Sequence, residues 1–277
     1  MRDLMIDAPG ARLHVADQGD PAHPAILLLH AGIADLRAWD DVAPLLVAGG
    51  YRVVRFDQRG SGQTTAEDVA FSNRADVLVV LDHVGARQAV LVGNSRGGQI
   101  AIDAAIEFPE RVAAVVGVAA GLGGFEGDLT PEEEDLFATM EALEEADPPD
   151  PAAIADIDIR IWVDGPGQPD DRVSAHIREA VRAMDEPLYE PDRVSGQPIR
   201  LVPPAADRLA ELRCPVLAVA GELDVSEVAQ TARHLAAHAP DARALVWPDV
   251  AHMIGMELPE RLAAAIIDFL GPLPRWS

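Results

Sequence analysis

The chain has 277 residues, of which 49% are hydrophobic, so it can bury a sizeable core and extensive disorder is excluded. Its formal net charge is −24 at pH 7, and arginine supplies every basic residue other than histidine. Such an acidic chain should repel nucleic acids and anionic membranes, so we expect a small-molecule substrate and neither of those partners; the composition leaves the oligomeric state open.

Short apolar runs alternate with helical patterns along most of the chain. Several runs lack polar alternation, which predicts strands buried on both faces of a parallel sheet. Strands are predicted at residues 13–15, 25–29, 52–56, 89–92, 113–118, 216–220 and 244–247. Helices are predicted at residues 36–48, 73–84, 96–108, 228–239 and 259–270. This alternation predicts an α/β fold with a doubly wound, mostly parallel sheet.

The alternation stops after residues 121–124 and resumes at residue 214. The intervening stretch is acidic, rich in proline and helically patterned, and in Leu136, Phe137, Met140 and Leu143 the apolar positions share one helical face. We therefore predict an inserted helical cap, or lid, over residues 122–206, with the α/β core in residues 1–121 and 207–277. The carboxylates of this stretch lack the spacing of a calcium loop, so we expect a solvated helix face and no metal.

Residues 93–97 form a Gly-x-Ser-x-Gly pattern where a predicted strand meets a predicted helix. A serine on such a turn exposes its hydroxyl on a tight bend, and Gly93 and Gly97 keep side-chain bulk away from it. That geometry suits a nucleophile, which makes Ser95 the candidate. The alternative is that Ser95 only caps the helix.

A serine nucleophile needs a base, usually histidine, and an acid that orients the histidine. Asp224 and His252 each follow a predicted strand, where open α/β sheets place their sites. We predict a Ser95, Asp224, His252 triad. The alternatives are a helix-capping Asp224 with Glu222 as the acid, and a His252 that is only a surface loop residue.

Acyl transfer also needs donors for the oxyanion, each worth roughly 3–4 kcal/mol. We predict the backbone N–H groups of Arg96, which follows the nucleophile, and of Gly32, with Ile33 as its neighbour. His30 is expected to be structural and to tie loops together by hydrogen bonds.

Four segments together resemble the α/β-hydrolase superfamily, in its capped esterase, lactonase and C–C hydrolase branch. They are His30-Ala31-Gly32 with Trp39, residues 56–62 (Phe-Asp-Gln-Arg-Gly-Ser-Gly), residues 108–112 (Phe-Pro-Glu-Arg-Val), and Ala251-His252 with Glu257 and Pro259. Two residues depart from the family pattern. Ala31 stands where glycine is usual, and Arg96 replaces the common methionine. The Arg96 side chain is expected to pair with a carboxylate, and the alternative is contact with a polar substrate group.

Motif and resemblance together imply a serine hydrolase that cleaves a small to medium, largely apolar carboxylic ester or lactone through an acyl-enzyme on Ser95, with no metal and no organic cofactor. The alternatives are a C–C bond hydrolase of a vinylogous diketone, a cofactor-free perhydrolase, and a small-molecule binding protein on a hydrolase scaffold. Epoxide hydrolases and haloalkane dehalogenases resemble this fold but carry aspartate at the position of Ser95, which disfavours them. The residues expected to line the substrate pocket are Ile33, Trp162, Met184 and Met253.

The single cysteine, Cys214, precedes Pro215 at the start of an apolar run, which predicts a buried, inert thiol and excludes an internal disulfide. Residues 1–10 show no secretory signal pattern, and no apolar run approaches the roughly 20 residues that span a bilayer. We therefore expect a cytoplasmic protein.

Overall fold

The computed structural model describes residues 1–276, and a nine-stranded sheet lies at its centre. The spatial order is β1-β2-β4-β3-β7-β8-β10-β11, with β5 paired to β2. The strands are β1 (Arg2–Ala8), β2 (Ala11–Gln18), β3 (Ala25–Leu29), β4 (Arg52–Phe56), β5 (Thr65–Ala66), β7 (Ala89–Asn94), β8 (Val112–Val118), β10 (Val216–Gly221) and β11 (Ala242–Trp247). From β4 to β11 all neighbours are parallel, whereas β2 runs antiparallel to β1, β4 and β5. The predicted fold class, a mostly parallel α/β sheet, is therefore confirmed.

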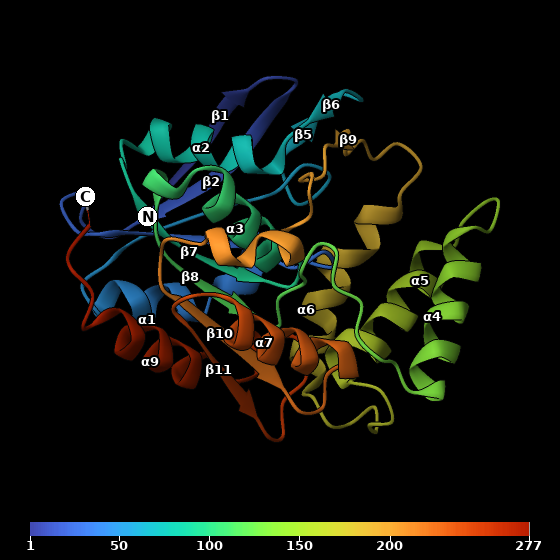
Figure 1. Cartoon of the computed structure of the whole chain (residues 1–277). Helices are drawn as coiled ribbons and strands as arrows, with labels where there is room; N and C mark the ends of the chain where they lie inside the picture. The colour runs from blue at the N-terminus through green and yellow to red at the C-terminus, as the bar shows by residue number, and fades with distance from the viewer. Residues whose placement is uncertain (277) are drawn as a thin grey trace.

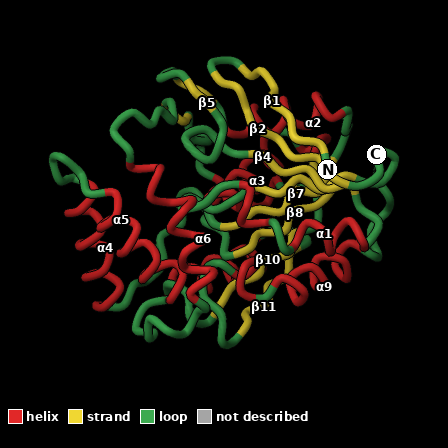
Figure 2. The backbone as a smooth tube through the Cα atoms, turned by 180° about the vertical axis from the view of Figure 1, so that it is seen from behind, coloured by secondary structure: helices red, strands yellow, loops and turns green. Residues whose placement is uncertain are grey.

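Helices cover both faces of the sheet (Figures 1 and 2). Those attached to the sheet are η1 (Leu36–Trp39), α1 (Val42–Ala48), α2 (Asn73–Val84), α3 (Arg96–Glu107), η2 (Pro109–Arg111), α7 (Ser226–His238), α8 (Ile254–Glu257) and α9 (Pro259–Leu270). Helices α1 and α9 pack together on one face, and α2, α3 and α7 lie on the other. Strands β3, β4, β7 and β10 are buried along their whole length because helices cover both faces, as their apolar runs predicted.

Two details differ from the sequence prediction. The predicted helix at residues 36–48 is divided, because Asp35 caps the short helix η1 and Asp40 and Asp41 separate it from α1. Strands β1 and β5 of the central sheet were not predicted. Strand β5 has only two residues, and β1 is an edge strand with mostly exposed side chains, so neither has the apolar run by which the other strands of this sheet were identified.

Between β8 and β10 the chain leaves the central sheet. This stretch holds α4 (Pro131–Glu144), α5 (Pro151–Asp158), η3 (Ile159–Asp164), α6 (Ala175–Asp185) and η4 (Glu186–Tyr189), which we call the inserted helices. It continues through β9 (Gln197–Pro198), which pairs with β6 (Ala70–Phe71), and η5 (Ala205–Glu211). Figure 1 shows α4 and α5 side by side at one edge of the molecule. The function of these helices as a lid stays a prediction.

Helix α4 begins with a capping box, in which the Thr130 hydroxyl accepts from the Glu133 amide and the Glu133 carboxylate accepts from the Thr130 amide. The same carboxylate accepts from the amide and the hydroxyl of Ser226, the first residue of α7. Glu133 therefore attaches the inserted helices to the core. In residues 1–276 no helix is both long and apolar enough to cross a membrane.

Candidate active site

Ser95 joins β7 to α3 in a conformation that is unusual for a residue with a side chain. Its φ is 54° and its ψ is −118°, and its side chain makes no capping hydrogen bond. Ser95 therefore occupies the N-cap position of α3, but its hydroxyl does not cap the helix, so the alternative that the side chain serves as a helix cap is wrong. A non-glycine residue at positive φ costs of order 1–3 kcal/mol and is found mainly at functional sites, where the surrounding structure holds it in place.

The two glycines that flank Ser95 are required by close packing. A Cβ on Gly93 would overlap the backbone of Gly97. A Cβ on Gly97 would lie 2.7 Å from the His30 carbonyl oxygen and closer still to that of Leu29. These close approaches place the start of α3 directly against the end of β3, so the nucleophile turn and the predicted oxyanion loop are neighbours.

Asp224 and His252 form a buried pair at the carboxyl ends of β10 and β11. The His252 Nδ1 atom lies 2.8 Å from one Asp224 carboxylate oxygen and 3.1 Å from the other. The two residues are only 6% and 3% exposed, so His252 is not a surface loop residue. Val225 occupies the N-cap of α7, and Glu222 is exposed, so both alternatives for the acid are wrong. Asp224 also accepts a hydrogen bond from the Val225 amide (2.8 Å), which fixes the carboxylate.

Backbone contacts bring the histidine loop to the serine turn. The Asn94 side-chain amide donates to the His252 carbonyl (3.3 Å) and to the Val118 carbonyl (3.1 Å). Gly221 lets the Asp224 loop approach the histidine loop, because a Cβ there would lie 2.7 Å from the Ala251 carbonyl oxygen. Ser95, Asp224 and His252 therefore gather at one end of the sheet, and their catalytic roles stay a prediction.

The predicted oxyanion donors lie where the sequence placed them. The Arg96 amide heads α3, where an intrahelical acceptor is lacking, and the Gly32 amide lies in the turn after β3. Within residues 1–276 neither amide donates to another backbone group. Ala31 is not at positive φ, so alanine fits this position as well as glycine would. A role of Gly32 and Arg96 in binding an oxyanion stays a prediction.

Gln58, which the sequence analysis did not single out, organises this corner of the site. Its amide donates to Nε2 of His30 (2.9 Å), and its side chain donates to the His30 carbonyl (2.7 Å). Burial, and next the charge of Arg96, lower the pKa of His30 to about 4, so the ring is neutral and structural as predicted. The Arg96 Nε atom donates to the Gln58 side-chain oxygen (3.2 Å).

The prediction that Arg96 pairs with a carboxylate is therefore wrong. Its hydrogen-bond partner is the neutral amide of Gln58, and no carboxylate within residues 1–276 forms an ion pair with it. The guanidinium remains reachable by water, yet burial among protein atoms lowers its pKa. The sequence could not reveal this, because Gln58 and Arg96 meet only when β4 and β7 lie in one sheet.

A second residue missed from the sequence is Arg172, which holds the histidine loop from the inserted segment. It forms an ion pair with Glu257 (2.6 Å) and donates to the carbonyls of Val163 and Asp164. Glu257 in turn accepts from the Ala251 amide (3.2 Å), next to His252. In the sequence, only the match of Glu257 to the histidine segment of the resembled family pointed to this contact.

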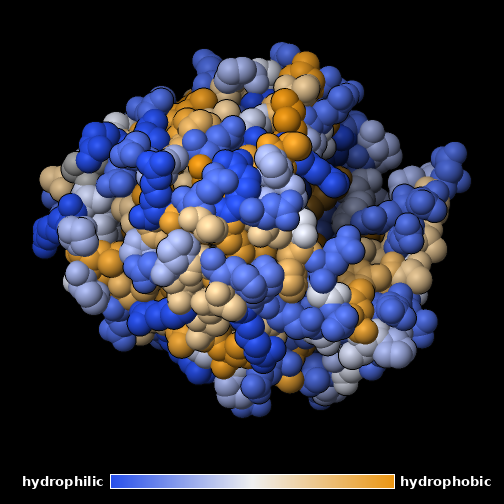
Figure 3. All heavy atoms as spheres, viewed as in Figure 1, coloured by the Kyte–Doolittle hydropathy of each residue, from blue (hydrophilic) through white to orange (hydrophobic). Residues whose placement is uncertain are grey.

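The four predicted pocket residues lie together at the boundary between the core and the inserted helices. Ile33, Met184 and Met253 are buried in one apolar cluster, and Trp162 packs against it. The Trp162 and His252 rings lie 4.6 Å apart between centroids. On the face drawn in Figure 3, the surface is hollowed between the body of the molecule and the protruding helices α4 and α5. Contact of these four residues with a substrate stays a prediction.

Residues 1–276 contain no cluster of three or more histidine, cysteine or acidic side chains that could hold a metal ion. Cys214 is buried, and burial raises the pKa of its thiol to about 12, as the prediction of an inert thiol requires.

Comparison with known proteins finds similar sequences and structures along most of the chain. The family model described as alpha/beta hydrolase fold matches residues 24–259. Rhodomycin D methylesterase of Streptomyces peucetius is 29% identical over 283 residues, covering 90% of this chain and 91% of that protein. Epoxide hydrolase B of Mycobacterium tuberculosis is 37% identical over 127 residues, covering 43% of this chain and 36% of that protein. The structure of carboxylesterase CesB from Bacillus subtilis is similar, with a TM-score of 0.75, 19% identity and coverage of 97% of this chain and 91% of that chain.

Proposed function

This chain belongs to the α/β-hydrolase fold family, and from that premise we propose that it is a serine esterase or lactonase. The substrate would be a small to medium, largely apolar carboxylic ester or lactone, cleaved through an acyl-enzyme on Ser95. The supporting observation is that Ser95 has a strained backbone at positive φ and a hydroxyl that caps no helix, and that the turn carrying it contacts the loop of a buried Asp224–His252 pair. The similarity to a methylesterase along most of the chain agrees with ester chemistry.

In the proposed cycle, Asp224 accepts the Nδ1 proton of His252 in a hydrogen bond and keeps Nε2 free as a base. His252 takes the hydroxyl proton as Ser95 Oγ attacks the ester carbonyl, and the amides of Gly32 and Arg96 stabilise the oxyanion. His252 then protonates the leaving alkoxide, which departs and leaves the acyl-enzyme. A water molecule, deprotonated by His252, attacks that ester; the returning proton regenerates Ser95 and the acid product departs.

The buried cluster of Ile33, Met184 and Met253, with Trp162 against the histidine ring, would give the substrate an apolar surround. These side chains come from the core and from the inserted helices, so movement of the inserted helices as a lid would open and close the site.

Replacement of Ser95 by alanine tests the nucleophile. Turnover of 4-nitrophenyl butyrate should fall by at least about 10⁴-fold, because the covalent step is removed, while circular dichroism stays native. The matched control is Ser174→Ala, which removes an exposed hydroxyl that makes no capping hydrogen bond at the start of α6. Turnover by the folded Ser95→Ala variant at the rate of the unsubstituted protein would overturn the proposal.

Covalent labelling distinguishes an enzyme from a binding protein on the same scaffold. A fluorophosphonate should attach to Ser95, identified by mass spectrometry, and labelling should depend on His252. An intact Ser95 after exposure would favour a binding protein. Epoxide hydrolase B matches less than half of this chain. Ser95 stands where that family carries aspartate, so we do not expect an epoxide-hydrolase activity that persists unchanged in the Ser95→Ala variant.

A further inference from the structure

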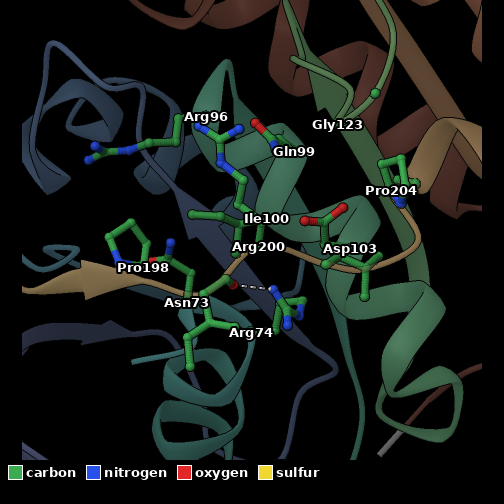
Figure 4. Close-up of a pocket in the computed structure, with 14 residues that line it drawn as sticks. Asn73, Arg74, Arg96, Gln99, Ile100, Asp103, Gly123, Pro198, Arg200 and Pro204 are labelled. Atoms are coloured by element: carbon green, nitrogen blue, oxygen red, sulfur yellow. Dashed lines mark hydrogen bonds between the residues drawn. The ribbon is translucent and has the colours of Figure 1, made fainter. Parts of the chain in front are cut away.

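A cavity with a volume of about 620 Å³ begins beside the nucleophile turn. One wall is a face of α3 that carries Arg96, Gln99 and Asp103, and the opposite wall is the segment at residues 198–205. Figure 4 shows Arg200 reaching from that opposite wall towards Gln99, while Arg96 extends along the edge of the cavity away from Asp103.

Gln99 links this cavity to Ser95 by a fixed distance. The backbone amide of Gln99 donates to the Ser95 carbonyl (3.0 Å), so Gln99 lies one helical turn, a rise of about 5.4 Å, from the nucleophile. A ligand group bound at Gln99 is therefore within reach of a short flexible chain whose other end lies at Ser95.

The cavity carries positive charge that the protein itself does not neutralise. Arg74 forms an ion pair with Glu107 and donates to the Ile199 carbonyl, so its charge is compensated and it holds the opposite wall in place. Arg200 and Arg96 form no ion pair with any carboxylate in residues 1–276. Two uncompensated guanidinium groups at one cavity are notable in a chain of net charge −24, where carboxylates outnumber arginines.

Asp103 marks the other end of the cavity. It is 7% exposed, and among the described residues 1–276 its side chain makes no hydrogen bond and its enclosed Oδ1 atom has no partner. Burial raises the pKa of Asp103 to about 6. An anionic ligand group would be repelled from Asp103 and attracted to Arg200, so the two side chains orient a charged ligand along the cavity.

We propose that this cavity binds the free carboxylate of a monoester of a dicarboxylic acid, with Arg200 and the side-chain amide of Gln99 as its donors and Arg96 adding positive potential. A guanidinium donates two parallel N–H groups to a carboxylate, which fixes the orientation of the ligand. The proposal rests on the esterase function and narrows its largely apolar substrate to an apolar chain that carries one free carboxylate: the ester carbonyl lies at Ser95 and the carboxylate one helical turn away.

Two esters that differ only in charge test the substrate class. The anionic 4-nitrophenyl hydrogen adipate and its neutral methyl ester release the same chromophore at pH 8. We expect kcat/KM to favour the anionic ester, and high salt to reduce that preference by screening. Arg200→Gln should lower the ratio of the two kcat/KM values about tenfold, a loss typical of a charge-assisted hydrogen bond.

Asp103→Asn is the matched substitution of opposite sign in the same cavity. It removes a negative charge, so the ratio should rise severalfold. Three outcomes would each overturn the proposal. They are a preference of the unsubstituted protein for the neutral ester, an unchanged ratio of the two kcat/KM values in Arg200→Gln, and a shift of that ratio in the same direction in both variants.

A binding measurement separates this proposal from the esterase function. Titration calorimetry of the Ser95→Ala variant with monomethyl adipate and with neutral dimethyl adipate needs no turnover. Tighter binding of the anionic adipate, lost when Arg200→Gln is added, supports the carboxylate site. This holds even if neither nitrophenyl ester is hydrolysed, because the missing hydrolysis would overturn the esterase function alone. Equal binding of the two adipates overturns the carboxylate site even if both esters are hydrolysed.

Discussion

Ser95 keeps its strained backbone because its neighbours leave no alternative. Glycine at positions 93 and 97 lets the end of β3 and the start of α3 touch backbone to backbone. The Asn94 side-chain amide holds the histidine loop by donating to the carbonyl of His252. At this scale function depends on the absence of side chains as much as on their chemistry.

Gly97→Ala should destabilise the protein by about 3 kcal/mol or more, because its Cβ would overlap the carbonyl of Leu29 at the rigid end of β3. Urea denaturation measures the free energy of unfolding. The control is Gly32→Ala, where a Cβ meets nothing within 4 Å and the change should stay within about 0.5 kcal/mol. Equal losses in both variants would contradict the close-packing argument.

At the scale of elements, the inserted helices are attached to the core at a few defined points. Glu133 binds the start of α7, Arg172 binds Glu257, and Gly165 packs so closely on the Asp224 loop that a Cβ there would overlap the Leu223 carbonyl. Each contact ends beside a member of the proposed triad. The position of the inserted helices is therefore coupled to the geometry of the acid and the base.

Thr130→Ala should lower the free energy of unfolding by about 1 kcal/mol, because the hydroxyl caps α4 at the Glu133 amide. Thermal and urea unfolding measure the change. Thr139→Ala, which also removes a threonine hydroxyl from α4 but at an exposed position within the helix, should change stability by less than about 0.5 kcal/mol. A larger loss in Thr139→Ala than in Thr130→Ala would argue against the capping box.

At the scale of the whole molecule, one buried carboxyl group, that of Asp185, makes the stability of the fold depend on pH. Asp185 is fully buried, and neither of its carboxylate oxygens accepts a hydrogen bond from an N–H or hydroxyl group within residues 1–276. Burial, and next the neighbouring Asp158 carboxylate, raise the pKa of Asp185 to about 8; Glu144 adds to the rise and Arg182 opposes it. Asp185 is thus held as a neutral acid near neutral pH.

This burial makes stability depend on pH. The unfolded chain loses the Asp185 proton near pH 4, whereas the folded protein keeps it until about pH 8. The folded state therefore binds more protons in this window, and stability falls as pH rises from about 4 to 8. Asp185→Asn should match the unsubstituted protein at pH 4 and exceed it by at least about 1 kcal/mol at pH 8, measured by urea denaturation.

Asp268→Asn removes one carboxylate from an exposed position and should leave the pH profile unchanged. If Asp268→Asn reproduces the gain of Asp185→Asn at pH 8, the effect comes from the overall negative charge and not from burial.

The sequence by itself determined most strands of the central sheet, the nucleophile turn and the acid–histidine pair. It did so because these features have local causes: apolar runs for buried strands, glycines at a tight turn, and short polar loops after strands. Helices α2 and α9 begin and end at the predicted residues for the same reason, since a capping serine before α2 and a proline at the start of α9 are local signals.

Only the tertiary structure decided how distant segments meet. It paired Arg96 with Gln58 and not with a carboxylate, joined Arg172 to Glu257, enclosed Asp185 beside Asp158, and left Arg200 uncompensated across a cavity from Asp103. These outcomes depend on which strands are neighbours and on where the inserted helices pack, and no local pattern encodes the partner of a buried charge. The positions of the residues near Ser95 were therefore predictable from the chain, whereas the distribution of charge around the cavity was not.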